Sequence, residues 1–547
     1  MIFDGFWLPV GLRGRALAGA TWETYWLRGG VTSREETAGA IAVRWPRLAP
    51  TEWRGLLTEL GAARRPAGQE ALARWQAALE GARGRLLADA ATIIPALAAC
   101  TGYSPEMLMA ALWQGDLISI DFLLAALQFQ PTWATATRWE RMPGLAGQIR
   151  FFPAGPLDRI TASLRGRAPL CRPAPRIELA LGYAAGNVPG TALLIALLGG
   201  LANQAAGDAV TAPAVVVRNS RHEPLFAPWL LAAVEAIDPE LVAGLAVLIW
   251  DYDEAAIQRE VLARAGLMIA AAGDYTIAAL DAQCTQFAPN LRFHRHGHKV
   301  SFAVIEALET GSWKLETGSQ RERANPQSAF RNPHSAIPRL AAVDSSLWDQ
   351  NGCLSARIHF VAGDADGYAQ ALTGQMRELA ATMPRGTTPR RFIHRAFDTF
   401  KTLEGLGDVQ VFSGYDDDFA VIRDRRPWDA ERVARAANAC MGRVTIVRPV
   451  RDVLDAPGYL RWLPPANLQS VSVAMDGRHV LEFADAAGAC GVTAIRSLGR
   501  AAFPQLAYSW DGLLPLDVAH LRPAGHFSTV EFDDLAGELA ETASRWE

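Results

Sequence analysis

The chain has 547 residues; half are apolar and a fifth are charged, and 53 basic residues against 57 acidic ones leave a formal charge of −4. This length allows roughly three or four domains, and the balance of residue types is typical of a folded globular protein. The sequence has no long basic block, which argues against a nucleic-acid-binding protein.

Features of export and membrane insertion are missing from the sequence. The amino-terminal residues include Asp4 and lack a basic run, so they do not resemble a secretory signal. The most apolar segment, residues 192–202, is about half as long as a helix that crosses a bilayer. We therefore expect a cytoplasmic protein that does not span a membrane.

The motifs of several common enzyme and metal-binding classes are also missing. None of the three lysines follows a glycine, which excludes a P-loop, and the sequence has no HExxH and no GxSxG motif. The six cysteines form no CxxC pair, which argues against a zinc ribbon or a dense disulfide framework.

Residues 1–150 are predicted to form a mostly helical amino-terminal region. Apolar residues recur there at steps of three and four, as on the buried face of a helix, at Leu72, Trp75, Leu79, Ala82 and Leu86. Ser104 and Pro105 then suit an N-cap followed by a proline at the first helical position.

From about residue 175 the apolar pattern alternates between strands and helices. Strands are predicted at 177–181, 214–217, 245–250 and 267–271, and helices at 191–205, 225–236 and 253–265. This alternation predicts βαβ units with a parallel sheet. Ligands of such sheets bind beyond the carboxyl ends of the strands. The sequence places there Gly186, Asn187, Arg218, Asn219, Asp251, Ala272 and Gly273.

A second α/β region follows a polar segment at 310–336, which we expect to lie on the surface. Its predicted elements are a strand at 357–361, a helix at 368–381 and a strand at 409–412. The chain is therefore expected to have an α/β fold, with two sheet-containing domains and a helical amino-terminal region.

The segment Gln350-Asn351-Gly352-Cys353, shortly before the predicted strand 357–361, is the first candidate for chemistry. A glycine before the cysteine permits a tight turn and leaves the thiol accessible. A thiolate is strongly nucleophilic and exchanges readily with other thiols, so Cys353 suits covalent catalysis on a thioester. On composition alone, a cysteine is more often a core residue.

The segment Gly186-Asn187-Val188-Pro189-Gly190 connects a predicted strand to a predicted helix. The Asn187 amide could donate a hydrogen bond to an oxygen that becomes negative when a thiolate attacks a carbonyl. Such a donor contributes about 3 kcal/mol in related systems. The alternative is a turn that only starts the helix.

Three histidines alternate in Phe293-His294-Arg295-His296-Gly297-His298-Lys299. Alternating histidines can bind a metal ion from one face of a strand. The sequence shows no matching cluster of cysteines or carboxylates, so no metal site is expected. We expect these polar residues to line a cleft, with His296 and His298 as the acid–base candidates.

These three segments, in this order, resemble the fatty-acyl-CoA reductases of the LuxC type, a branch of the aldehyde dehydrogenase superfamily. The resemblance extends from about residue 177 to about residue 357 and returns weakly near Gly491 and at Trp510-Asp511-Gly512. It implies an aldehyde-dehydrogenase-like fold with a Rossmann-type nicotinamide-cofactor-binding domain at 151–290 and a catalytic domain at 291–480. The carboxyl-terminal segment 481–547 is expected to pack back on the other domains. The amino-terminal helices would be a scaffold or, as the alternative, shape an acyl channel.

The resemblance also implies catalytic roles. Cys353 matches the nucleophile that accepts the acyl group. Asn187, together with the backbone N–H of Cys353, matches the donors to the oxyanion. The proton donor is left open between His296 and His298.

Four residues are assigned to cofactor binding. Arg218 and Gly273 match positions that contact the cofactor in the superfamily, and Asn219 follows Arg218 at the same strand end. Arg221 stands where relatives that prefer NAD often have a glutamate. An arginine there suits a 2′-phosphate, so NADPH is expected, with NADH as the alternative; Arg221 would otherwise be a surface arginine.

Relatives that hydrolyse their acyl-enzyme share a Glu-Leu-Gly-Gly-Lys segment whose glutamate activates water. Aligned on Gly297 and Lys299, this chain has Arg295 at that position. A reductase that works on a thioester needs no such water. The resemblance therefore implies NADPH-dependent reduction of an acyl thioester to an aldehyde.

Two other functions stay open at this point. One is an aldehyde dehydrogenase that oxidises aldehyde to acid, with an unaligned acid such as Glu306 as its base. The other is an inactive relative that binds acyl chains or partner proteins.

The resemblance further implies the partners of the reaction. The expected substrate is an acyl-CoA or an acyl-carrier protein, and an acyltransferase or acyl-protein synthetase would be the partner enzyme. A homo-oligomer is expected because the superfamily commonly oligomerises, and no nucleic acid is expected to bind.

Overall fold

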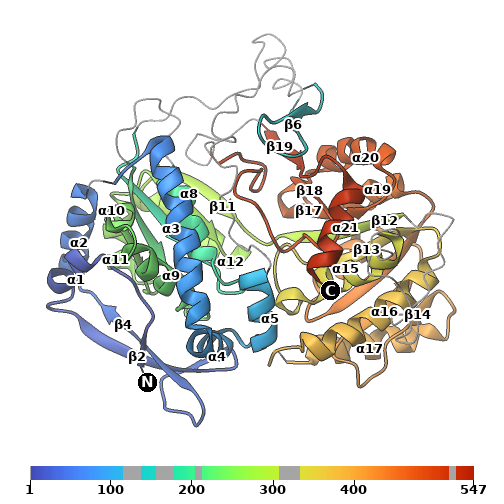
Figure 1. Cartoon of the computed structure of the whole chain (residues 1–547), viewed down its shortest axis with the longest axis horizontal. Coiled ribbons are helices and arrows are strands. Elements are labelled where there is room, and N and C mark those ends of the chain that lie inside the picture. The colour runs from blue at the N-terminus through green and yellow to red at the C-terminus, as the bar shows by residue number, and fades with distance from the viewer. Residues whose placement is uncertain are drawn as a thin grey trace.

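The computed structural model describes residues 2–63, 65–114, 137–155, 176–201, 203, 212–306, 333–387, 389–515 and 525–546. These residues form three sheets flanked by helices (Figure 1). The polar segment predicted at 310–336 lies, as far as residue 332, outside the described residues.

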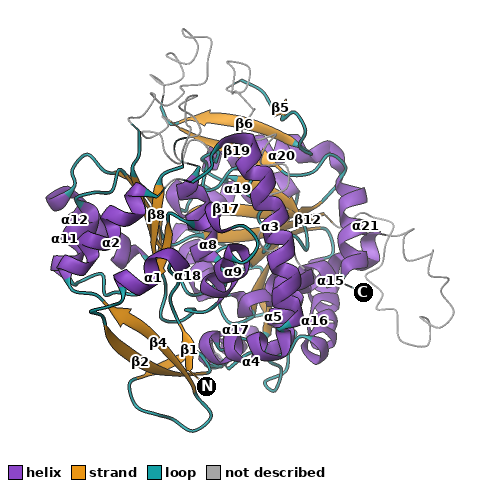
Figure 2. Ribbon diagram, turned by 60° about the vertical axis from the view of Figure 1, so that its left-hand side comes forward, coloured by secondary structure: helices purple, strands orange, loops and turns teal. Residues whose placement is uncertain are grey.

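The amino-terminal region contains a four-stranded sheet, which corrects the prediction of a mostly helical region. Its strands pair in the order β1-β4-β2-β3, and Figure 2 shows β1, β2 and β4 together at one end of the molecule. The prediction missed this sheet because it followed helical spacing, whereas Thr21–Arg28 is rich in the β-branched and aromatic residues typical of strands. The elements are β1 (Ile2–Asp4), α1 (Val10–Ala16), β2 (Thr21–Arg28), β3 (Val31–Ser33), β4 (Ile41–Arg47), α2 (Pro50–Ala62), α3 (Gly68–Ala88), α4 (Ala90–Thr101), α5 (Pro105–Met109) and a π-helical turn (Ala110–Gln114).

The later part of this region is helical, as predicted. Helix α3 carries the predicted apolar stripe, with Leu72, Trp75 and Ala82 buried. Ser104 caps α5 by accepting a hydrogen bond from the backbone N–H of Met107 at 3.2 Å. Among the described residues, no single helix is long and apolar enough to cross a membrane. The pair α3 and α4 meets both criteria only when the two are taken together, and they are bent by 89°.

The next sheet has five strands, all parallel, in the order β11-β10-β7-β8-β9. The predicted α/β alternation is confirmed here. The chain winds outward in both directions from the boundary between β7 and β10, and ligands of doubly wound sheets bind beyond the carboxyl ends at such a point. The elements are β7 (Leu179–Tyr183), α8 (Thr191–Gly200), β8 (Ala214–Arg218), α9 (Phe226–Glu235), α10 (Pro239–Val242), β9 (Leu245–Leu248), α11 (Ala255–Leu262), β10 (Leu267–Ala271), α12 (Asp274–Phe287) and β11 (Arg292–His296).

The third sheet has ten strands in the order β14-β15-β16-β13-β12-β17-β18-β19-β6-β5. The strands from β15 to β19 in this order are parallel, and the pairs at both edges are antiparallel. Its strands are β5 (Glu140–Arg141), β6 (Gln148–Pro153), β12 (Val300–Glu306), β13 (Ala356–Ala362), β14 (Val409–Val411), β15 (Ala420–Asp424), β16 (Val444–Val450), β17 (Leu468–Ala474), β18 (Ala494–Ser497) and β19 (Gly525–Val530).

Helices cover this sheet. They are α15 (Pro333–Ser346), α16 (Ala365–Thr382), α17 (Arg391–Glu404), α18 (Ala430–Ala439), α19 (Ala456–Leu460), α20 (Gly477–Cys490) and α21 (Leu535–Arg545). Short 3₁₀ helices are formed by Leu347–Gln350, Val453–Asp455 and Pro465–Asn467.

The sheets cross the boundaries predicted from the sequence. Strand β11 belongs to the five-stranded sheet although it lies beyond residue 290, because its pairing with β10 decides its place. The segment 481–547 contributes β18 and β19 to the ten-stranded sheet and so does more than pack against it. Pairing between distant strands cannot be read from local sequence.

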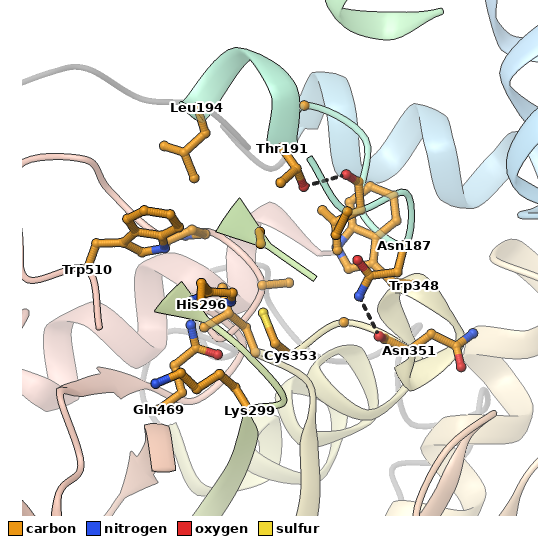
Figure 3. A pocket seen from close by; sticks show the side chains of 18 of the residues that line it. Asn187, Thr191, Leu194, His296, Lys299, Trp348, Asn351, Cys353, Gln469 and Trp510 are labelled. Atoms are coloured by element: carbon orange, nitrogen blue, oxygen red, sulfur yellow. Dashed lines mark hydrogen bonds between the residues drawn. The ribbon is translucent and has the colours of Figure 1, made fainter. Parts of the chain in front are cut away.

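Only residues 297–299 separate β11 from β12, so the chain passes directly from one sheet to the other. The carboxyl edge of the five-stranded sheet therefore faces the amino edge of the ten-stranded sheet. His296 ends β11, and Cys353 lies in the turn before β13; the two side chains lie close together between the sheets (Figure 3).

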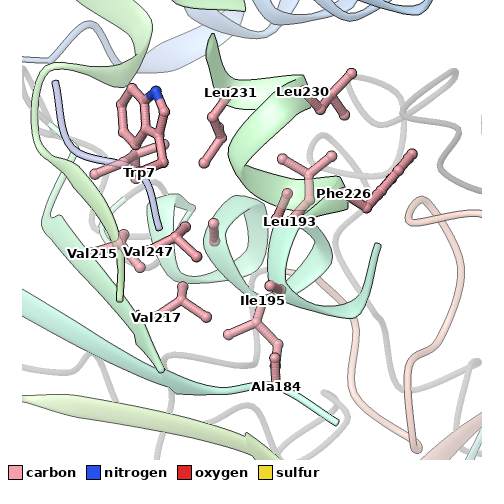
Figure 4. Packing of buried hydrophobic residues seen from close by; sticks show 14 of the residues in the cluster. Trp7, Ala184, Leu193, Ile195, Val215, Val217, Phe226, Leu230, Leu231 and Val247 are labelled. Carbon is pink, nitrogen blue, oxygen red and sulfur yellow. The ribbon is translucent and has the colours of Figure 1, made fainter. Parts of the chain in front are cut away.

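One hydrophobic core extends from the amino-terminal region into the five-stranded sheet, and a second fills the ten-stranded sheet. Trp7, which is 1% exposed, joins the first two units. The backbone N–H of Trp7 donates to Val247 O at 2.8 Å, and the backbone N–H of Val247 donates to Trp7 O at 2.9 Å. Figure 4 shows the Trp7 ring packed near Val247 and Leu231.

We expect Trp7→Ala to destabilise the protein by about 3–5 kcal/mol, because it leaves a cavity where the two units share a core. Thermal unfolding followed by circular dichroism should show a lower Tm. Ile2→Ala, at a residue that is 57% exposed, is the control and should change stability by no more than about 0.5 kcal/mol. An unchanged Tm for Trp7→Ala would contradict the joining role of this ring.

Candidate active site

Cys353 lies in the turn between the 3₁₀ helix Leu347–Gln350 and β13, and its side chain is partly exposed. Trp348, Asp349 and Gln350 have φ angles of 56°, 46° and 58°. This left-handed conformation costs about 1–3 kcal/mol for each non-glycine residue. The backbone before the cysteine is therefore strained, as is common where a reactive side chain has to be presented.

Buried side chains hold this turn in place. Arg443 Nε donates to Asp349 Oδ1 at 3.0 Å, and the two side chains are 1% and 0% exposed. Gln350 Nε2 donates to Ala356 O at 2.9 Å, and Gln350 Oε1 accepts from Val444 N at 2.7 Å. Burial raises the pKa of Asp349, and the Arg443 guanidinium opposes this shift.

Asn187 approaches the same turn from the five-stranded sheet. It lies in the loop between β7 and α8, where Gly190 adopts a φ of 90° at the start of the helix. Asn187 Nδ2 donates to the backbone oxygen of Asn351 at 2.9 Å (Figure 3), across a separation of 164 residues. The two segments expected to supply the nucleophile and the oxyanion donor thus meet.

A cavity of about 380 Å³ lies between these segments. Five of the residues assigned from the sequence line it: Asn187, Gly273, His296, His298 and Cys353. Arg218, Asn219 and Arg221 are not part of the lining. Apolar lining is contributed by Val188, Leu194, Leu354, Met441, Leu506 and Trp510.

His296 pairs with Asp511 through Nδ1, and its ring stacks on Trp510 with centroids 5.2 Å apart and an interplanar angle of 15°. The Cys353 side chain lies next to the same ring (Figure 3). Burial alone would lower the pKa of His296, but the Asp511 carboxylate and the Cys353 sulfur outweigh it and raise the pKa to about 10. His296 is therefore an imidazolium at neutral pH and places a positive charge beside the Cys353 sulfur.

Asp511 is the residue of this cluster that the sequence interpretation did not assign. Its carboxylate accepts from Gln469 Nε2 at 3.3 Å and lies 3.7 Å from Lys299 Nζ. Burial would raise the pKa of Asp511, but the charges of His296 and Lys299 hold it below its usual range. The available signal was the Trp510-Asp511-Gly512 segment, which by itself indicates a turn.

The other two histidines of the alternating segment are placed differently. His298 lines the cavity, with Nε2 at 3.1 Å from Asn438 Oδ1. His294 is partly buried, and the loss of solvent around it lowers its pKa to about 4. Of the two acid–base candidates, His296 is therefore the one that contacts both a carboxylate and the thiol. No group of three His, Cys, Asp or Glu side chains that could hold a metal ion occurs in the described residues.

Gly273 lies at the amino-terminal end of α12, on the five-stranded side of the cavity. A Cβ added there would meet no atom within 4 Å, so a ligand can approach the backbone closely. A helix amino terminus with accessible N–H groups suits the pyrophosphate of a dinucleotide. This part of the cavity therefore fits such a group.

The arginines at the end of β8 lie beside this edge but are already engaged. Arg218 Nε donates to Trp250 O at 2.7 Å. Arg221 Nη2 pairs with Asp251 Oδ2 at 2.8 Å, and its guanidinium lies 5.3 Å from the Tyr25 ring centroid.

Asn219 was assigned to cofactor binding because it follows the end of a strand. In the structure its side chain is buried in a turn of the protein itself. It is 1% exposed. Its amide donates to Pro224 O at 3.1 Å, and its Oδ1 accepts from Ser220 N at 3.0 Å. The side chain stabilises the turn after β8 rather than facing a ligand.

The lining of the cavity, as far as the chain is described, contains no aspartate and no glutamate. Arg295, which the resemblance aligns with the water-activating glutamate, pairs with Asp281 outside the lining. Glu306 ends β12 and accepts from Asp476 N at 2.8 Å, at the opposite edge of the ten-stranded sheet.

Solved aldehyde dehydrogenases have the same fold. The protein is similar to an aldehyde dehydrogenase from Brucella melitensis biovar abortus 2308, with a TM-score of 0.55, 12% identity and coverage of 93% of this chain and 94% of that chain. A Delta-pyrroline-5-carboxylate dehydrogenase from Mycobacterium tuberculosis gives a TM-score of 0.54 at 13% identity, covering 94% of this chain and 88% of that chain. An aldehyde dehydrogenase from Mycobacterium tuberculosis complexed with NAD+ gives 0.52 at 15% identity, covering 93% and 95%. The fold class is therefore that of the aldehyde dehydrogenases.

The family can be stated more narrowly. The family profile of the acyl-CoA reductases of the LuxC type matches residues 180–520. The chain belongs to this family, as its sequence motifs predicted, and is an oxidoreductase acting at the aldehyde level. Among curated proteins, none matches the chain.

We expect Asp511→Asn to slow alkylation of Cys353 at neutral pH. In the native protein His296 keeps its proton up to about pH 10. Without the carboxylate, burial makes the imidazole lose its proton near or below its ordinary value of about 6.5. Iodoacetamide should then react more slowly at pH 7, because the positive charge beside the sulfur is lost.

Cys353→Ala, measured in parallel, gives the rate at which the other cysteines are alkylated, and this background rate is subtracted. Identical pH profiles for native protein and Asp511→Asn would show that His296 does not control the sulfur.

Proposed function

We propose that this protein reduces an acyl thioester to an aldehyde through an acyl group carried on Cys353, with NADPH as the reductant. The observation that carries the proposal is the cavity in which Cys353, His296 and Asn187 meet without a carboxylate in the described lining. The substrate is an acyl-CoA or an acyl-carrier protein, because both present the acyl group as a thioester.

The first step is transfer of the acyl group to the sulfur. The Cys353 thiolate attacks the thioester carbonyl, and the carbonyl oxygen becomes negative. Asn187 Nδ2 and the backbone N–H of Cys353 are the donors available to this oxygen, in place of the bond that Nδ2 now makes to Asn351 O. The leaving thiolate takes a proton from the His296 imidazolium, which regains one from solvent.

The second step is reduction of the acyl group. A bound nicotinamide dinucleotide supplies a hydride to the acyl carbon. Asn187 again stabilises the oxygen as it becomes negative, and cleavage of the carbon–sulfur bond releases aldehyde and restores the Cys353 thiolate. The balance is one thioester, one NADPH and one proton consumed, with one aldehyde, one thiol and one NADP+ formed.

The cavity disfavours the competing oxidation of aldehyde to acid. That reaction needs a base to activate water against the acyl-enzyme. Two positions were considered for such a base. Arg295 is paired with Asp281, and Glu306 accepts a hydrogen bond from the backbone N–H of Asp476. The close placement of Cys353, His296 and Asp511 likewise disfavours an inactive relative.

We expect purified protein mixed with an acyl-CoA and NADPH to lose nicotinamide absorbance and form aldehyde, and Cys353→Ala to lose this activity entirely. The physical reason is that the acyl group then has no nucleophile to accept it. A panel of acyl-CoA thioesters of increasing chain length should be tested, with intact mass spectrometry to detect the acylated protein. Equal rates in the native protein and Cys353→Ala would refute the mechanism.

The choice of NADPH rests on Arg221, which would pair with a 2′-phosphate. Because Asp251 now holds this guanidinium at 2.8 Å, we expect Asp251→Asn to lower the KM for NADPH several-fold. Arg221→Ala should raise the KM for NADPH about tenfold and leave that for NADH within about twofold. If both substitutions leave both KM values unchanged, Arg221 does not select the cofactor.

A further inference from the structure

Tyr103 contacts two residues that line the cavity, Asn187 and Trp348, from the amino-terminal region, outside the segment that the family profile matches. Helix α4 ends at Thr101, and Gly102 turns the chain with a φ of 78°. This turn directs the following tyrosine toward the gap between the two larger sheets, and Figure 1 shows α5, which begins two residues later, lying between them.

The Tyr103 side chain touches both segments of the candidate active site. Its hydroxyl donates to the backbone oxygen of Asn187 at 2.5 Å. Its ring packs on that of Trp348, with centroids 5.4 Å apart. Tyr103 is 5% exposed, and burial raises its pKa, so the hydroxyl keeps its proton and remains a donor.

A loop after α16 holds this tyrosine segment in place. Thr387 N donates to Gly102 O at 2.6 Å, and Thr387 Oγ1 donates to Gly29 O at 2.9 Å. Gly386 N donates to Asp349 Oδ2 at 3.1 Å. A Cβ at Gly386 would lie 2.0 Å from Gly102 O, so the approach requires glycine. The loop thus connects the tyrosine segment to the same carboxylate that holds the nucleophile turn.

We propose that Tyr103 is a positioning residue for the Asn187 amide. The proposal rests on the function given above: the amide helps only if it points to the place where the oxyanion forms, and small displacements of such a donor are costly. Tyr103 fixes the backbone of Asn187 through a hydrogen bond and fixes its distance from the nucleophile turn through Trp348. The amino-terminal region therefore completes the active site.

A double-mutant cycle on the full-length protein tests this. Tyr103→Phe removes only the hydroxyl and should lower kcat about 5- to 10-fold, with KM for acyl-CoA within about twofold. If Tyr103 acts through Asn187, the double variant Tyr103→Phe/Asn187→Ala should be no slower than Asn187→Ala alone. Alkylation of Cys353 by iodoacetamide should be unchanged in Tyr103→Phe, because His296 and Asp511 are untouched.

Tyr368→Phe is the matched control, since its buried hydroxyl bonds His359 Nδ1 at 2.8 Å inside the ten-stranded domain. It should lower stability and leave kcat unchanged. Thr387→Val is a second variant in case Tyr103→Phe does not fold. It removes the hydroxyl that lies 2.9 Å from Gly29 O and 3.2 Å from Gly102 O, and it should lower kcat in the same way.

Native kcat in Tyr103→Phe, or effects that multiply in the double variant, would overturn the positioning role while leaving the proposed function intact. Full activity in Cys353→Ala would instead overturn the proposed function itself.

Discussion

The buried ion pair between Asp349 and Arg443 determines the geometry of the cavity. It anchors three consecutive residues in a left-handed conformation that they would not adopt alone. Removing one partner of such a pair costs about 3–5 kcal/mol, because the other charge is left buried. That energy is comparable to the strain it opposes. The turn that presents Cys353 is thus imposed by the domain around it.

The Asp349 carboxylate also accepts a hydrogen bond from the backbone N–H of Gly386, in the loop that contacts the amino-terminal region. In that region Tyr103 donates a hydrogen bond to the backbone oxygen of Asn187. Parts of the two larger sheets therefore meet at the cavity of about 380 Å³, and the amino-terminal region contacts its lining through Tyr103. The geometry of the site thus depends on contacts among three parts of the chain.

Local sequence patterns predicted four of the five strands of the five-stranded sheet, because each of these four is a short apolar run followed by a helix. Strand β11 is polar and leads directly into β12, so the apolar pattern missed it. They also selected Cys353, Asn187 and His296, whose neighbours carry family motifs. The role of Asp511 was not predicted, because an aspartate next to a glycine is common in turns and only the fold brings it to His296. Two further features were not predicted: the strand pairing of the carboxyl-terminal segment and the role of Tyr103. Both depend on contacts between residues far apart in the chain.

The thiol and its charged partner belong to different sheets. His296 ends β11, Cys353 precedes β13, and residues 297–299 form the link between the two sheets. The orientation of one sheet relative to the other therefore decides whether the imidazole of His296 lies beside the sulfur. A substitution that shifts one sheet against the other would dismantle the site without changing any residue in it.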